Sequence, residues 1–533
     1  MTLAGAMTDP VTVAVLQSRL CAIAEEMGEA MLRTSYSQIL NSSRDFSIAI
    51  VDAGCRLVAQ ADHIPVHVGA MPWAARAVAA AFPDPAPGDL FLLNDPYHGG
   101  SHLPDLTALA PVFARDGALQ FWSVVRGHQS DIGGSTHGGY NPAATDIWQE
   151  GLRVPPIRLT EGGEVRNDLV GMLAANTRNA RDFRGDLAAM LGAARLGTAR
   201  LSAVLAEAGP DVLRAAVDAM LDAAERHARS IVECWQDGDY DGVALLDDDG
   251  HGTEDIAVRA RVTVAGGEVT VDLTGSDPQV AGFVNSSHAN MQSAVAMAFA
   301  YLLDPGCARN DGAFRPLRVV AQEGTVVWAR EGAPVTLCTS HCSNEIVEAV
   351  IDALSSACPD RAMGGWGRRF RLALTGRDAR SGRHFIWHLF HARPGGGASS
   401  AGPGWPAAGE WHSVGGIKFG SVEVTEARFP LVLERHEFRE GAGGAGRHQG
   451  GDGASLLLRV ESDGPAAANT AGDGVRHGAR GMCGGADGLP HHYVLEAPGQ
   501  APQVLRTKQA GIAVPPGSRF CILSGGGGGW GTA

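Results

Sequence analysis

The sequence has 533 residues, 45% of them apolar and 19% charged, which is typical of a globular protein and excludes a disordered chain. Lys and Arg number 43 against 58 Asp and Glu, and the net charge of −15 disfavours nucleic acid as a partner because such a surface repels phosphates. No apolar stretch reaches the roughly 20 residues of a membrane-spanning helix, and the start lacks a secretory signal, so we expect a cytoplasmic protein without a membrane partner. Nine cysteines without a framework spacing fit reduced thiols.

The first predicted element is an amphipathic helix over residues 10–34, where apolar residues recur with a helical period. Two short strands around a turn at 52–54 follow it, and a helix over 72–81 precedes a polar segment described below. Further along, the pattern predicts a β-meander at 243–277, a helix at 287–303 and another helix at 344–357.

Glycine is the compositional outlier, with 71 residues in several clusters. The cluster at 439–453 lacks the Gly-x4-Gly-Lys-Ser/Thr pattern of a phosphate-binding loop, so we predict turns in a tightly packed β-lobe and no ATP site in this chain. The segment 391–413 is rich in Gly, Pro and Ala and poor in apolar anchors, which predicts a mobile loop or the tip of an excursion.

These elements predict a mixed α+β fold of several lobes, with β-sheets, packed helices and a β-rich C-terminal lobe. We divide the chain into three regions: an N-terminal region with a metal site at 1–205, a central α+β region at 206–435, and a glycine-containing β-rich lobe at 436–533.

The segment 91–156 concentrates acidic and histidine side chains in an apolar, glycine-rich surrounding. Two His-x-x-Asp motifs, His102 to Asp105 and His128 to Asp131, lie at the far ends of two strand patterns joined by an Asp-Gly turn. A hairpin brings such ends together, and four imidazole and carboxylate ligands suit zinc, manganese or iron. Surface hydrogen bonding is the alternative reading of each motif.

Other side chains leave alternatives open. Glu150 and His137 are candidate proton carriers beside a metal, although a salt-bridged acid explains Glu150 equally. His63 and His67 line a site or are hydrogen-bonded core residues. Arg178, Arg181 and Arg184 share a helix face that is either solvated or contacts an anionic group. Cys338 and Cys342 are four apart, and buried apolar cysteine is favoured over a zinc site.

Several longer motifs carry a resemblance to a known family. They are DFS at 45–47, IPVH at 64–67, NDPYHGGSHLPD at 94–105, RGHQSDIGG at 126–134, WQEGLRVPP at 148–156 and TGSDPQVAGFVNSS at 274–287. With the glycine-rich runs near the C-terminus, they cover nearly the whole chain, which resembles the hydantoinase B family. In that resemblance, Asp45 joins the metal ligands, whereas a strand-entry Asp taken alone is more often a turn or capping acid.

The resemblance implies ATP-dependent opening of a cyclic amide: a hydantoin, 5-oxoproline or a similar lactam. ATP and Mg then come with a partner, a hydantoinase A-like subunit in a hetero-oligomer, which phosphorylates the amide oxygen. A metal in this chain delivers water to the activated carbon. Two alternatives remain: a ketone carboxylase subunit of the acetone carboxylase type, and a non-catalytic scaffold for the ATP-binding subunit.

Overall fold

The computed structural model describes residues 9–61 and 63–533. Its N-terminal part is built on one seven-stranded sheet in the order β2-β1-β5-β4-β3-β6-β7. The strands are β1 Phe46–Asp52, β2 Leu57–Ala61, β3 Leu90–Leu93, β4 Asp105–Phe113, β5 Leu119–His128, β6 Ile157–Glu161 and β7 Glu164–Val165. β4 and β5 form the predicted hairpin.

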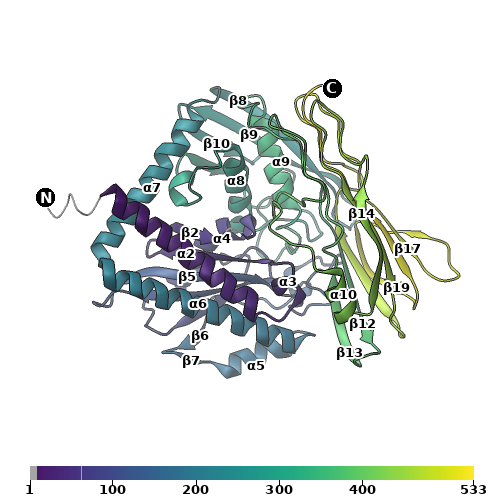
Figure 1. The fold of residues 1–533 in the computed structure, drawn as a ribbon, viewed down its shortest axis with the longest axis horizontal. Helices are drawn as coiled ribbons and strands as arrows, with labels where there is room; N and C mark the ends of the chain where they lie inside the picture. Colours follow the sequence, from purple (N-terminus) through teal and green to yellow (C-terminus); the bar gives the residue numbers. More distant parts are fainter. Residues whose placement is uncertain (1–8, 62) are drawn as a thin grey trace.

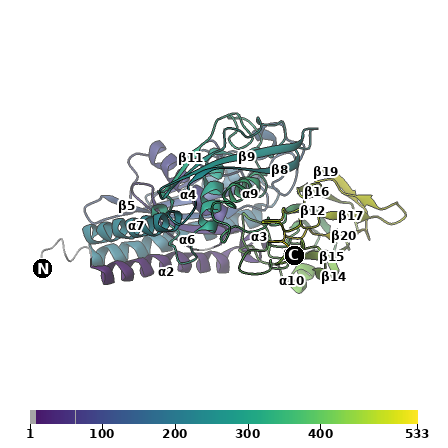
Figure 2. The same cartoon turned by 90° about the horizontal axis from the view of Figure 1, so that it is seen from above.

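Helices cover both faces of this sheet, which explains why β1 is buried along its full length. One face packs against α2 (Pro10–Thr34) and α6 (Ala180–Ala208), and the other against α4 (Pro65–Ala81). Phe46, Ile48 and Ile50 belong to the larger core cluster with α2 and α6, whereas Ala49 and Val51 belong to the cluster around α4. In Figure 2, α2, α6 and α7 (Pro210–Val232) form a layer along one side of the molecule.

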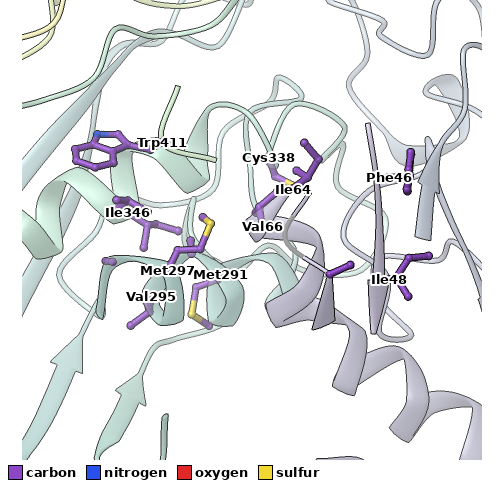
Figure 3. Close-up of a cluster of buried hydrophobic side chains, with 14 of the residues drawn as sticks. Phe46, Ile48, Ile64, Val66, Met291, Val295, Met297, Cys338, Ile346 and Trp411 are labelled. Atoms are coloured by element: carbon purple, nitrogen blue, oxygen red, sulfur yellow. The ribbon is translucent and has the colours of Figure 1, made fainter. Parts of the chain in front are cut away.

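A second sheet of four strands, in the order β11-β10-β9-β8, follows in the chain. Its strands are β8 Gly238–Asp248, β9 Glu254–Ala265, β10 Glu268–Asp272 and β11 Leu317–Val320. α9 (Cys342–Leu354) packs on β8 and β9, and α8 (His288–Leu302) packs between α9 and α4. Figure 3 shows the resulting core, in which Ile64 and Val66 lie between the strand residues Phe46 and Ile48 and the α8 methionines.

The C-terminal part is β-rich and lies at one side of the molecule in Figure 1. One of its sheets has the order β13-β12-β16-β19, and the other β14-β15-β20-β17-β18. The bounds are β12 Phe370–Asp378, β13 Arg383–His388, β14 Leu431–Arg439, β15 Gly453–Val460, β16 Ala466–Gly472, β17 His492–Glu496, β18 Gln503–Val504, β19 Lys508–Val514 and β20 Arg519–Leu523. The α+β fold class is confirmed, and the division at 205 and 435 stays a prediction.

The remaining helical segments are short or follow β7. They are α3 Gln38–Asn41, η1 Ile147–Gln149, α5 Asn167–Ala175, η2 Asp311–Phe314 and α10 Val422–Arg428. Within the described residues, no helix combines the length and the apolar character needed to cross a membrane.

The cluster at 439–453 contains the predicted turn at Glu440–Gly441, and the glycine-rich segments beyond it are also hydrogen-bonded to one another. Gly451 N donates to Gly396 O at 2.8 Å, Gly527 N to Gly451 O at 2.8 Å, and Gly444 N to Gly527 O at 2.9 Å. A Cβ on Gly527 would lie 2.0 Å from Gly396 O, so glycine alone fits there. The prediction of a mobile loop at 391–413 is wrong, because most residues at both ends of this segment are buried, Trp411 among them.

Candidate functional site

Strand register places three ligand-type side chains at one end of the first sheet. Asp105 on β4 pairs with His128 on β5, and Phe46 on β1 pairs with Gly127. Asp45, directly before Phe46, therefore lies beside His128, whose backbone N–H donates to Asp45 O at 3.1 Å. All three side chains are buried.

The side chains of His102, Asp105 and His128 converge. Asp105 Oδ1 lies 2.9 Å from His102 Nε2 and 2.9 Å from His128 Nδ1. One ligand atom from each of the three lies within 4.8 Å of the others, which is the spacing of a metal site. His102 Nε2 is buried without an aligned hydrogen bond despite the nearby carboxylate. Such an orphaned nitrogen is expected where a nitrogen and an oxygen point at a common third position, so the residues fit a divalent cation.

His67 joins this group from a different element. Its residue pattern left open whether it belongs to a site, and the structure places it in the first turn of α4, not in an extended segment. His67 Nε2 lies 3.3 Å from Asp105 Oδ2 and 3.6 Å from Asp45 Oδ1. Burial lowers the pKa of His67 to about 4, although the two carboxylates act in the opposite direction, so the imidazole is neutral and can serve as a ligand.

Asp105 is the only carboxylate that contacts all three rings in this group of described residues. Burial alone would raise its pKa, but His102 and His67 outweigh that effect and hold the pKa well below its usual range. Ser101 Oγ donates to Asp105 Oδ2 at 2.7 Å, which fixes the carboxylate. The fully buried Arg126 adds a positive charge nearby, and its Nε donates to Thr107 Oγ1 at 2.8 Å.

Glu150 contacts the segment that orients His102. Its two oxygens accept from the backbone N–H of Val335 at 2.9 Å and of Thr336 at 2.8 Å. His102 Nδ1 lies 2.5 Å from Thr336 O, so this carbonyl orients the ring and directs Nε2 toward Asp105. Burial raises the pKa of Glu150 to about 8, against the two backbone donors.

Asp131 and His137 lie outside the convergent group. Arg178 donates to both Asp131 oxygens, from Nη1 at 3.0 Å and from its backbone N–H at 2.7 Å. His137 Nε2 lies 3.2 Å from Ala373 O on β12, so this ring faces the C-terminal sheets. The two His-x-x-Asp motifs therefore differ: the first delivers both side chains to the group, and the second delivers only His128.

Three further buried residues that the sequence did not single out are Tyr140, Arg371 on β12 and His412. The Tyr140 ring stacks on His128 with centroids 5.9 Å apart, and its hydroxyl lies 3.4 Å from His128 Nε2. The Arg371 guanidinium lies 4.4 Å from the Tyr140 ring centroid. His412 is buried, and neither of its ring nitrogens has a hydrogen-bond partner. No spacing signal links these three, because they are separated by many elements.

A family model described as hydantoinase B/oxoprolinase matches residues 9–533, nearly the whole chain. The chain belongs to this family. Caprolactamase subunit beta of Pseudomonas jessenii is 36% identical to it, over 84% of this chain and 78% of the relative. The crystal structure of the ATP-dependent caprolactamase from that organism superposes with a TM-score of 0.92 at 32% identity, over 98% of this chain and 91% of that one.

Two further similarities bear on the alternative functions. 5-oxoprolinase 1 of Arabidopsis thaliana is 28% identical over 99% of this chain, which spans 42% of that longer protein. The nucleotide-free structure of an acetone carboxylase has a TM-score of 0.90 at 19% identity, over 99% of this chain and 76% of that one. At that identity, the similarity to the carboxylase shows a shared fold alone.

Proposed function

We propose that this hydantoinase B/oxoprolinase family member is the hydrolytic subunit of an ATP-dependent enzyme that opens a lactam or related cyclic amide. The observation that carries the proposal is the buried convergence of His102, Asp105 and His128. Similarity to a protein titled an ATP-dependent caprolactamase supports the substrate class. That relative is named as a subunit, which supports a hetero-oligomer with an ATP-binding, hydantoinase A-like partner.

The proposed ligands of a divalent cation are Asp45, His67, His102, Asp105 and His128. His67 replaces Asp131 in the ligand set predicted from the sequence, because Arg178 binds the Asp131 carboxylate. Zinc, manganese and iron all suit a set of neutral imidazoles and carboxylates. When bound, the cation supplies Lewis acidity that lowers the pKa of water and polarises the substrate.

The amide needs activation because resonance makes its carbon a poor electrophile. In the proposed sequence, the partner transfers the terminal phosphoryl group of ATP to the amide oxygen and ADP leaves. Water then adds to the activated carbon, the C–N bond breaks to give an amine and an acyl phosphate, and a second water releases phosphate. The net reaction consumes one ATP and two waters and yields an amino acid, ADP and phosphate.

The chain's own residues position this chemistry. Both Glu150 oxygens accept from backbone amides, so we propose that Glu150 orients His102 through Thr336 and transfers no proton in the reaction. His137 is bonded to β12, and we assign it no step. The shared fold is the one observation that favours the carboxylase alternative.

Metal analysis of the purified chain tests the proposal. We expect about one divalent cation per chain in the wild type, and loss of it in Asp105→Asn and His128→Ala, which remove convergent ligands. Asp131→Asn is the matched control, since it removes a carboxylate from the neighbouring motif and is expected to keep the metal. With the ATP-binding subunit added, only metal-containing chains should form amino acid from a lactam. A folded wild type free of metal but active would refute the proposal.

A further inference from the structure

Arg371, on β12, is a buried cation without a carboxylate partner among the described residues. Arg371 is 7% exposed; its Nε donates to Ser340 Oγ at 3.4 Å, and its guanidinium lies over the Tyr140 ring. Three neighbouring buried arginines are paired with glutamates, whereas Arg126 donates to Thr107 Oγ1 and to the His67 carbonyl. Arg368 Nε lies 2.6 Å from Glu345, whereas Arg369 and Arg393 lie 3.1 Å and 3.7 Å from Glu410.

The unpaired guanidinium lies next to the candidate metal centre. Tyr140 contacts Arg371 with its ring face and His128 by stacking, and so connects the two. A buried charge with no counter-charge is costly, and proteins retain such groups where a charged ligand completes the pairing. The uncompensated positive charge of Arg371 therefore indicates an anionic ligand at this position.

His412 is a second buried side chain without a partner among the described residues. It is 2% exposed, and both ring nitrogens lack a hydrogen-bond partner, which is rare for buried polar atoms. Burial lowers the pKa of His412 to about 3, and the positive charges of Arg371 and Arg369 lower it further. The carboxylates of Glu410 and Asp45 act in the opposite direction without outweighing burial. The Val66 N–H, directly before His67 in the chain, donates to His412 O at 3.4 Å, so the backbone of His412 lies beside the proposed metal ligands. As a neutral imidazole, it can donate one N–H to a ligand oxygen.

We infer that Arg371 and His412 bind the phosphoryl group of the activated amide, and afterwards the released phosphate, beside the metal centre. This inference rests on the proposed function, in which the substrate reaches this chain carrying a phosphate. A guanidinium binds phosphate oxygens bidentately, whereas a lysine offers a single point charge. Arg371 thereby distinguishes the phosphorylated amide, a dianion, from the neutral lactam that has not been activated.

Inorganic phosphate is the probe, titrated calorimetrically into the full-length chain after its metal content has been measured. We expect Arg371→Gln to lower phosphate affinity at least tenfold with metal content unchanged, and Arg371→Lys to lower it less. Arg377→Gln is the matched control, because Arg377 is exposed on the same strand and is expected to bind phosphate like the wild type. His412→Phe keeps the ring volume and should weaken phosphate binding several-fold.

Two results overturn the inference and leave the proposed function standing: a metal-loaded wild type that binds no phosphate, and an Arg371→Gln variant that binds it normally. A wild type that lacks metal yet binds phosphate through Arg371 supports the inference while the proposed function fails. If Arg371→Gln does not fold, phosphate affinity is measured in Arg371→Lys, and the effect of phosphate on the melting temperature of the wild type is the second test. Phosphate should then raise the melting temperature more than chloride at equal ionic strength, and equal shifts would overturn the inference.

Discussion

Asp105 shows how burial sharpens the chemistry of one side chain. Its two oxygens are contacted by three imidazoles and the Ser101 hydroxyl, and its side chain has no exposed surface. In water these contacts would be weak, but in a buried site each is strengthened by the low local dielectric. The geometry depends in turn on residues that never touch Asp105, and Glu150 is the clearest of them.

We predict that Glu150→Gln weakens metal binding without removing any ligand. One of the two backbone N–H groups at Val335 and Thr336 then faces an amide N–H, which costs about 1–3 kcal/mol of stability. The Thr336 carbonyl that orients His102 then shifts. Metal affinity should fall roughly 10- to 100-fold, which is typical when a residue that hydrogen-bonds to a metal ligand is changed. Competition with a chelator measures this, with the exposed Glu161→Gln as control. Equal affinities would show that Thr336 needs no support from Glu150.

At this scale the sequence predicted much of the site. His102, Asp105 and His128 could be predicted because a hairpin fixes which residues lie opposite, and Asp45 came from the family resemblance. The side-chain direction of Asp131 could not be predicted, since it depends on Arg178, which comes from a separate loop. Arg371 and His412 carry no motif, because tertiary packing alone brings them to the site.

At the scale of elements, α6 illustrates how a glycine can be either incidental or required. The helix packs against α2 and β5, so its two faces meet different surroundings. Gly192 is exposed, and a Cβ there would meet nothing within 4 Å. A Cβ on Gly197 would lie 2.2 Å from Ser123 Oγ and 2.4 Å from Met27 Sδ.

We predict that alanine at these two positions has opposite effects. Gly192→Ala should stabilise the protein by about 0.5–1 kcal/mol, because alanine has the higher helix propensity. Gly197→Ala should destabilise it by roughly 1–3 kcal/mol, because the methyl group forces α6 away from α2 and β5. Urea denaturation of both variants beside the wild type measures the free energies of unfolding. A stable Gly197→Ala variant would mean that Met27 can move aside at little cost.

The helix boundaries themselves followed well from periodicity. The predicted helix at 10–34 matches α2, and the one at 344–357 matches α9 to within a few residues. The start of α4 was missed by several residues, because Pro65 in the first turn and Pro72 within the helix resemble breaks in a sequence. That error hid the helical position of His67.

At the scale of the whole molecule, backbone contacts between glycine segments replace a conventional core in part of the C-terminal region. The segments around Gly396, Gly451 and Gly527 approach closely: a Cβ on Gly451 would lie 2.1 Å from Trp405 O, and one on Gly527 would lie 2.0 Å from Gly396 O. No sequence pattern predicts such packing, since it depends on hydrogen bonds between distant extended segments and has no apolar period. Gly527→Ala should therefore destabilise the fold, whereas Gly464→Ala, with open space around it, should not. Thermal denaturation of the two variants distinguishes these expectations.

The same region is joined to the second sheet by a buried ionic cluster. Glu345 on α9 lies 2.6 Å from Arg368 Nε, and Arg368 Nη1 lies 2.5 Å from Glu348. Burial raises the pKa of Glu345 to about 8; Arg368 acts in the opposite direction and Glu348 adds to the rise. One proton is thus held by the folded cluster at pH values where an unfolded glutamate has already lost it.

This proton makes stability depend on pH in a definite direction. The pKa of Glu345 is higher in the folded than in the unfolded protein, so its contribution is fully present below about pH 4.5 and is lost as pH rises through about 8. Within that window the wild type should lose stability steadily as the pH rises, because the folded protein binds a proton that the unfolded protein does not. Glu345→Gln cannot titrate, so the stability of the variant relative to the wild type should rise steadily from pH 5 to pH 8.

Urea denaturation at pH 5, 6.5 and 8 measures that relative stability, with Glu164→Gln on the exposed β7 as a control whose difference from the wild type stays constant. Arg368→Met provides the converse test, because it leaves two buried glutamates without their cation and should steepen the loss of stability with rising pH. Parallel pH profiles for the wild type and Glu345→Gln would mean that the cluster is fully ionised in the folded protein, with Arg368 outweighing the effect of burial.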